Sequence, residues 1–89
     1  MRRYRIESGK KAAAIGYTPS DPAPLLLAAG KGREAERILE EARNAGIAIV
    51  EDAGLAALLA AARPGDYIPF WCWEAVAKIL AFVLDKESE

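Results

Sequence analysis

Few residues in this chain of 89 amino acids have types and spacings that could support chemistry. The chain has no histidine and one cysteine, Cys72, so a zinc site is not expected. Serine and cysteine hydrolases need an activating base, most often histidine. The serines, Ser8, Ser20 and Ser88, lie towards the chain ends or in a proline-rich segment. We therefore expect no catalytic residue, no metal, no cofactor and no enzymatic activity.

Glu51 and Asp52 place two carboxylates side by side in the sequence. Adjacent side chains tend to diverge, so the pair does not match the facing carboxylates of an acid–base site. We interpret Glu51 as a solvated strand end and Asp52 as the N-cap of the helix that follows.

Gly30-Lys31-Gly32 precedes a predicted helix, and backbone N–H groups at a helix N-terminus attract phosphate. The P-loop pattern is absent, and Ala35 replaces the third glycine of the dinucleotide fingerprint. Glu51 lies near the position of that fingerprint's acidic residue. However, 89 residues cannot supply the second half of a dinucleotide site, so we do not expect nucleotide binding.

The elements that would position these residues centre on residues 25–50. The apolar run Leu25–Ala29 predicts a strand covered on both faces, and residues 47–50, rich in β-branched side chains, predict another. Between them a helix is predicted, with Gly46 as its C-cap. Its apolar residues recur with helical spacing at Ala35, Ile38, Leu39, Ala42 and Ala45. A strand–helix–strand order with short links implies a right-handed crossover and a parallel pair.

The flanking segments extend this pattern. Residues 12–17 predict a further strand, and residues 18–24, with three prolines, predict a loop. Helices are predicted from Asp52 to the stop at Arg63-Pro64-Gly65 and over residues 70–85. We therefore expect an α/β fold, with a small sheet of three to four strands, a parallel βαβ unit and three surrounding helices.

The last predicted helix carries more apolar residues than one buried face needs. Its polar stripe consists of Glu74, Lys78 and Asp85, with Glu74 and Lys78 paired at i, i+4. The surplus either packs on the rest of the domain or leaves a face for a partner.

The formal net charge of −1 hides an asymmetry. Residues 1–11 carry five basic residues against Glu7, and the remainder is acidic; the basic residues are Arg2, Arg3, Arg5, Lys10 and Lys11. A basic arm could contact nucleic acid or an anionic membrane. We favour a solvated terminus, because no aromatic platform or basic helix face accompanies the arm.

No secretory signal or transmembrane segment is expected. The N-terminus lacks an apolar core, and the most apolar stretch, residues 68–84, contains Pro69, Glu74 and Lys78. We therefore expect a cytoplasmic location.

Several segments, in order, resemble the cytoplasmic C-terminal domain of the FlhB/YscU family, the export-apparatus proteins of flagellar and injectisome type III secretion. The similarity runs from about residue 12 to residue 84. The matching segments are Tyr17, Ala23-Pro24, Leu26–Gly32, Ala35–Ile38, Ile47–Glu51, Leu55–Leu59, Gly65–Pro69 and Ala75–Val83. On this resemblance, residues 1–11 form a basic arm that could serve as an edge strand, residues 12–85 form the FlhB-type domain, and residues 86–89 form a tail.

Two departures from the family are evident. Members that switch export specificity cleave themselves at Asn-Pro-Thr-His, and the corresponding residues here are Glu7, Ser8, Gly9 and Lys10, so we expect no autocleavage. The family's N-terminal transmembrane domain has no counterpart here, which suggests a stand-alone homologue. In the family, one strand is donated from before the cleavage site. Here Tyr4-Arg5-Ile6 either supplies that strand or leaves an edge open to a partner strand.

The resemblance also implies a docking role. The family's domain is thought to capture export substrates on a hydrophobic patch where the Ala-Pro loop meets the last helix. The matching residues are Ala23, Pro24, Ala77 and Leu80. This agrees with the surplus of apolar residues on that helix, although the four could simply pack the loop onto it.

We therefore expect a non-enzymatic protein-binding domain with an accessory role in export, without nucleic acid as a partner. Its partners would be flagellar or type III export substrates or export-apparatus proteins, at the inner face of the membrane export apparatus. The alternative is an anion- or nucleic-acid-binding module that uses the basic arm and Gly30-Lys31-Gly32. Binding of that kind would fall steeply with salt.

Overall fold

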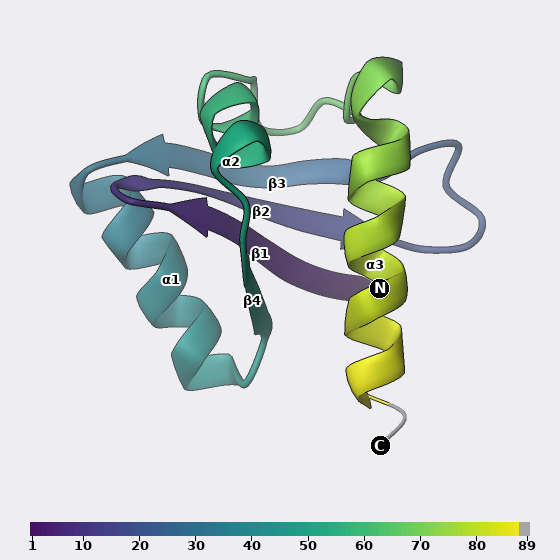
Figure 1. Ribbon diagram of the computed structural model, residues 1–89, viewed down its shortest axis with the longest axis horizontal. Coiled ribbons are helices and arrows are strands. Elements are labelled where there is room, and N and C mark those ends of the chain that lie inside the picture. Colours follow the sequence, from purple (N-terminus) through teal and green to yellow (C-terminus); the bar gives the residue numbers. More distant parts are fainter. Residues whose placement is uncertain (88–89) are drawn as a thin grey trace.

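The computed structural model describes residues 1–87, with the side chains of all but residues 84, 86 and 87. Within these residues, four strands form one sheet in the order β3-β2-β1-β4, and helices cover both of its faces (Figure 1). The elements in chain order are β1 (Arg2–Ser8), β2 (Lys11–Tyr17), β3 (Leu25–Lys31), α1 (Arg33–Ala45), β4 (Ala48–Glu51), α2 (Ala53–Ala60), the 3-10 turn η1 (Phe70–Cys72) and α3 (Trp73–Glu87).

The predicted α/β fold is confirmed, with a four-stranded sheet, a parallel pair and three helices. Strands β1, β2 and β3 pair antiparallel, and β1 pairs with β4 in parallel. The strands that flank α1, β3 and β4, run in the same direction but lie at opposite edges of the sheet. The parallel neighbour of β4 is therefore β1, and the crossover passes over two strands.

Residues 1–11 differ most from expectation. Strand β1 lies between β2 and β4, so the prediction of a solvated terminus is wrong. Of the two alternatives for Tyr4-Arg5-Ile6, the chain supplies the strand itself, but this strand lies inside the sheet rather than at its edge. The physical reason is alternation: Tyr4 and Ile6 point to one face and are fully buried, which places this strand at the centre of the core. The link to β2 is a two-residue turn, and Gly9 supplies its positive φ of 57°.

The sheet separates two apolar layers. On one side α1 packs on β2 and β3, where Ala12 and Ala14 of β2 are short enough to let the helix approach. On the other side α2 and α3 cover the larger core. The largest side chains there that are fully buried are Tyr4, Ile6, Ile15, Leu26, Leu59, Val76 and Val83.

Local signals set the helix ends. Helix α1 ends at Gly46, whose left-handed conformation (φ 70°) lets its N–H reach the carbonyls of Ala42 and Arg43. Asp52 caps α2 as predicted, because its Oδ1 accepts a hydrogen bond from Leu55 N at 3.0 Å. Helix α3 starts at Trp73, later than the predicted residue 70, since η1 occupies residues 70–72.

Helix α3 also includes the first half of the predicted tail, residues 86–87, while residues 88–89 lie outside the described part. None of the helices described is both long enough and apolar enough to span a bilayer.

Candidate functional site

The loop before β3 is held against the start of α3 by backbone hydrogen bonds. Ile68 N donates to Pro24 O at 2.8 Å, and Leu26 N donates to Asp66 O at 2.9 Å. Gly65 N donates to Leu26 O at 2.7 Å. The segment before η1 therefore pairs with the beginning of β3, and the Ala-Pro loop is brought to α3 although some 50 residues separate them.

The first turn of α3 is anchored to the same segment. Trp73 Nε1 donates to Ile68 O at 2.8 Å, while 46% of the Trp73 residue stays exposed. At the other end of the loop, Thr18 N donates to Asp21 Oδ2 at 3.0 Å, and Asp21 N donates to Thr18 O at 2.8 Å. These two bonds form a turn at the start of the proline-rich loop, where proline itself offers no N–H to donate.

The structure brings all four residues of the predicted patch to one shallow hollow of about 230 Å³. Ala23 is buried, Pro24 and Leu80 are half-buried, and Ala77 is exposed. We call this the docking hollow, and its lining residues are Tyr17, Pro22, Ala23, Pro24, Trp73, Ala77 and Leu80. None of these lining side chains is charged, so the hollow fits an apolar group.

Sequence reasoning missed Tyr17, Pro22 and Trp73 as lining residues. A signal for Trp73 was present, because residues 73, 77 and 80 are spaced at i, i+4 and i+7 along one helix face. Tyr17 is the last residue of β2, and Pro22 directly precedes the predicted Ala23-Pro24 pair. Tyr17 thus adjoins the loop that forms one wall of the hollow, and Pro22 lies within that loop.

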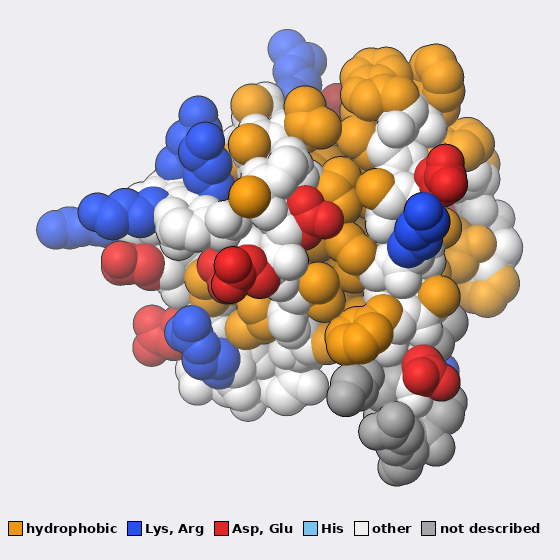
Figure 2. Space-filling view, viewed as in Figure 1, with side chains coloured by type: hydrophobic (Ala, Val, Ile, Leu, Met, Phe, Trp, Pro, Cys, Tyr) orange, Lys and Arg blue, Asp and Glu red, His pale blue; other side chains and the backbone are white. Residues whose placement is uncertain are grey.

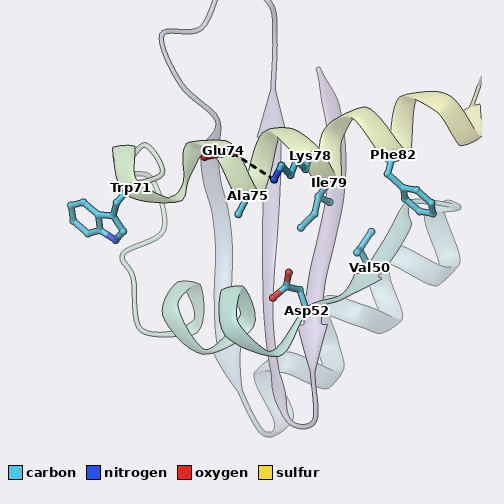
Figure 3. A pocket seen from close by; sticks show the side chains of 8 residues that line it. All are labelled: Val50, Asp52, Trp71, Glu74, Ala75, Lys78, Ile79 and Phe82. Carbon is cyan, nitrogen blue, oxygen red and sulfur yellow. Dashed lines mark ion pairs between the residues drawn. The ribbon is translucent and has the colours of Figure 1, made fainter.

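A second groove runs between α3 and the start of α2, beside the edge strand β4. Figure 3 shows Ala75 and Ile79 of α3 directed towards Val50 and Asp52, with the two aromatic lining residues at opposite ends. The groove has a volume of about 510 Å³ and is lined by Val50, Asp52, Trp71, Glu74, Ala75, Lys78, Ile79 and Phe82. The predicted ion pair of Glu74 and Lys78 forms at 3.5 Å on its exposed rim, where it adds little stability.

The structure shows that part of the apolar surplus around the last helix stays exposed instead of packing on the rest of the domain. Trp71 is 68% exposed and Phe70 71% exposed, and Phe82 also faces solvent. Figure 2 shows hydrophobic side chains gathered around α3 and in the space between α2 and α3. These aromatics are therefore not used to pack the domain's own core.

The chain's single thiol is not placed for chemistry. Cys72 is buried, and burial raises the pKa of its thiol, which keeps the reactive thiolate scarce at neutral pH. Among residues 1–87, no three histidine, cysteine or acidic side chains are grouped as a metal site would need.

The basic residues of the N-terminus do not form one surface. Arg5 is 8% exposed and lies within the sheet, whereas Lys10 and Lys11 lie at the hairpin turn. Burial, together with the charge of Arg3, lowers the pKa of Arg5, and Glu41 acts in the opposite direction. The alternative reading, in which the whole arm binds an anion or nucleic acid, loses Arg5 because its side chain is inside the protein.

Comparisons with known proteins place the chain in a family and show which structures share its fold. The model of the FlhB HrpN YscU SpaS Family matches residues 9–83. The uncharacterized protein YlqH of Bacillus subtilis (strain 168) is 40% identical over 75 residues, which cover 83% of this chain and 81% of YlqH. The flagellar biosynthetic protein FlhB of Aquifex aeolicus (strain VF5) is 40% identical over 80 residues, which cover 88% of this chain and 23% of FlhB.

Solved structures show the same fold. The cytoplasmic domain of FlhB from Shewanella putrefaciens superposes with a TM-score of 0.85 at 32% identity, covering 93% of this chain and 66% of that one. A mutated EscU C-terminal domain superposes with a TM-score of 0.83 at 26% identity, covering 90% of this chain and 82% of that one.

Proposed function

This chain belongs to the FlhB, HrpN, YscU and SpaS family, and from that premise we propose that it is a non-enzymatic binding domain that serves flagellar or type III protein export. Its fold is that of the FlhB and EscU C-terminal domains. The chain spans 23% of the length of the Aquifex FlhB, so the activity of a whole FlhB enters only as part of this proposal. The proposed location is at the cytoplasmic face of the membrane export apparatus, and the proposed partners are export substrates or apparatus proteins.

The observation that carries the proposal is the docking hollow. Two segments far apart in the sequence meet there, and Ala23, Pro24, Ala77 and Leu80 all line it. An apolar side chain that leaves water for such a hollow gains about 1.5–3 kcal/mol if it is fully buried. Association costs consume much of that gain, so we expect weak and reversible docking, as suits a substrate that must be released.

The hollow is preformed by hydrogen bonds within the domain, which strengthens the proposal. The bonds from Ile68 N to Pro24 O and from Trp73 Nε1 to Ile68 O hold both walls without a ligand. A partner therefore does not need to order the loop when it binds, and the affinity is not reduced by that cost.

The test is a titration of the ¹⁵N-labelled domain with purified export substrates, monitored by the NMR shifts of the backbone amides. Wild-type protein should show shifts concentrated at Tyr17, Ala23 and Ala77. The variant Ala77→Asp/Leu80→Asp should lose at least ten-fold in affinity, because two carboxylates would be desolvated in an apolar site.

Two further variants make the result interpretable. Leu58→Asp/Ala61→Asp places the same charges on exposed positions of α2 and its C-cap and should bind as wild type does. Ala77→Asp alone changes an exposed residue and covers the case in which the half-buried Leu80 is needed for folding. Equal binding by wild type and by folded Ala77→Asp/Leu80→Asp would exclude the docking hollow as the binding site.

A further inference from the structure

Three lysines gather at the end of the sheet that is remote from the docking hollow. Lys10 lies in the β1–β2 turn, Lys11 begins β2 and Lys31 ends β3. They surround a hollow of about 530 Å³ whose other wall includes Ala53 and Ala57 of α2. We call it the lysine hollow. Figure 2 shows Lys and Arg side chains gathered on the side of the molecule where, in Figure 1, the hairpin and the end of β3 lie.

The positions of these lysines follow from the sheet register. Lys11 and Lys31 are direct partners across β2 and β3. The two turns are also tied together, because Gly32 N donates to Lys10 O at 2.7 Å. The three charges are therefore brought together by backbone pairing rather than by the flexibility of long side chains.

This arrangement is unfavourable for the isolated domain. Like charges directly opposite each other destabilise an antiparallel pair. Among the described residues, no ion pair joins Lys10, Lys11 or Lys31 to a carboxylate. No direct ion pair within residues 1–87 offsets this repulsion. An acidic partner segment would supply such a counter-charge.

The nearby N-terminus of α1 does not supply the positive charge of this site. The first turn of α1 already contains Glu34 and Glu36, whose charges complement the helix dipole. The inference rests on the three lysines and the hollow that they surround.

We propose that the lysine hollow binds an acidic peptide segment of a partner protein. The hollow is concave, and the exposed Ala53 and Ala57 leave room for a backbone beside the three ammonium groups. Neighbouring strands are about 4.8 Å apart, and alternate residues of an extended peptide are about 6.6 Å apart. Flexible lysines on adjacent strands can therefore reach carboxylates at positions i and i+2 of one extended segment.

The surroundings favour a peptide over a membrane or a nucleic acid. The exposed Phe70 and Trp71 lie in η1, next to the start of α3. In Figure 1 that end of α3 lies on the opposite side of the view from the β1–β2 turn, so one flat membrane surface would not engage both. No aromatic residue lines the lysine hollow, so bases have no stacking platform there.

This site is separate from the docking hollow. Strand β2 joins the two, with Lys11 at the lysine hollow and Tyr17 at the docking hollow. Six residue steps along a strand span about 20 Å. The inference therefore stands or falls independently of the proposed function.

The experiment uses fluorescence anisotropy with a labelled decapeptide of alternating Glu and Ala, and with its Gln–Ala counterpart. Wild-type protein should bind the Glu peptide and not the Gln peptide, with affinity falling at least ten-fold between 50 and 300 mM salt. Lys11→Gln/Lys31→Gln should weaken binding at least ten-fold. Arg43→Gln/Lys78→Gln removes the same charge elsewhere and should stay within two-fold of wild type.

Several results would overturn the proposal. They are a lack of binding of the Glu peptide, equal losses in the two double variants, and stronger binding of phosphatidylserine vesicles or a single-stranded oligonucleotide.

Thermal unfolding checks that Lys11→Gln/Lys31→Gln is folded. Since the substitutions remove a repulsion, the unfolding midpoint should stay the same or rise. If it does fall, Lys10→Gln in the turn provides the same test. Ala77→Asp should leave peptide binding unchanged, which separates this site from the docking hollow.

Discussion

Arg5 shows how one side chain can conflict with its surroundings. Its neighbours in the sheet are Ala14 on β2 and Ile49 on β4, and only 8% of the residue is exposed. Its Nη1 donates to Tyr4 O at 3.3 Å, but its Nε finds no hydrogen-bond partner within the described residues. A buried cation with an unsatisfied donor costs free energy that a hydrophobic side chain of similar length would not.

We therefore expect Arg5→Met to raise the free energy of unfolding by about 1 kcal/mol. Urea unfolding followed by circular dichroism measures the change. Arg3→Met, at an exposed position two residues earlier, should change it by less than about 0.5 kcal/mol. A loss of stability in Arg5→Met would show that the attraction between Arg5 and Glu41 outweighs the cost of burial.

At the residue scale, the lining residues of the candidate site could be predicted only where the family resemblance supplied a matching motif. Ala23, Pro24, Ala77 and Leu80 came from the family resemblance, and the structure brings them to one hollow. The alternative of an anion-binding module did group the basic arm with Gly30-Lys31-Gly32. That Lys11 and Lys31 meet in one hollow was not predicted, because they are 20 residues apart in sequence and meet only through the pairing of β2 and β3. Register between strands is a tertiary property that spacing along the chain does not reveal.

At the scale of elements, the attachment of α3 to the sheet depends on apolar packing and on one long hydrogen bond. Val76 and Val83 of α3 are buried against Tyr4 and Ile15 in the main core. The hydroxyl of Tyr4 donates to Val76 O at 3.4 Å. Burial raises the pKa of Tyr4 well above its ordinary value of 10.0, so the phenol stays protonated in the folded protein.

This attachment predicts an alkaline loss of stability. In the unfolded chain the Tyr4 phenol ionises near pH 10, while the folded protein keeps its proton, so the stabilisation is complete below pH 10 and is lost as the pH rises above it. The expected slope is about −1.4 kcal/mol per pH unit. Burial raises the pKa of Cys72 as well, and this adds a loss in the same direction from about pH 9.

Urea titrations at pH 7, 9, 10 and 11 measure this effect. Tyr4→Phe should be less stable than wild type by about 0.5–1.5 kcal/mol at pH 7, since one hydrogen bond is lost. Above pH 10 its stability should fall less steeply. Parallel losses in the two proteins would mean that Tyr4 is not the group responsible.

The element-level errors of sequence reading have a common physical cause. In β1 the alternating Tyr4 and Ile6 are the period-two signal of a strand, but the charged Arg3, Arg5 and Glu7 around them are typical of a solvated segment. The pattern around α1 was read correctly, because helix periodicity is local. The partner of β4 was not predicted, because β1 supplies it and lies about 40 residues earlier in the sequence.

At the scale of the whole molecule, the sheet is formed without a break in the chain. Glu7 to Lys10, which the family resemblance matches to the cleavage motif, form the end of β1 and a two-residue turn. The only asparagine in the sequence, Asn44, lies in α1 and is followed by Ala45 rather than proline. The asparagine that self-cleavage would need is thus not available at the hairpin.

We accordingly predict that the purified protein remains one polypeptide. Intact-mass spectrometry over several days at pH 7 to 9 should show a single species of 9.6 kDa. A sample kept in denaturant controls for contaminating protease. Two fragments that meet between residues 7 and 10, formed only by the folded protein, would contradict the prediction.

The Gly9-Lys10 turn has a thermodynamic consequence for the domain. Because β1 and β2 belong to one covalent chain, separating them is a unimolecular step whose equilibrium does not depend on dilution. A sheet assembled from two polypeptides would instead shed a strand by mass action as its concentration fell. The docking hollow and the lysine hollow, at the two ends of β2, are therefore present in the same proportion of molecules whether the protein is scarce or abundant in the cell.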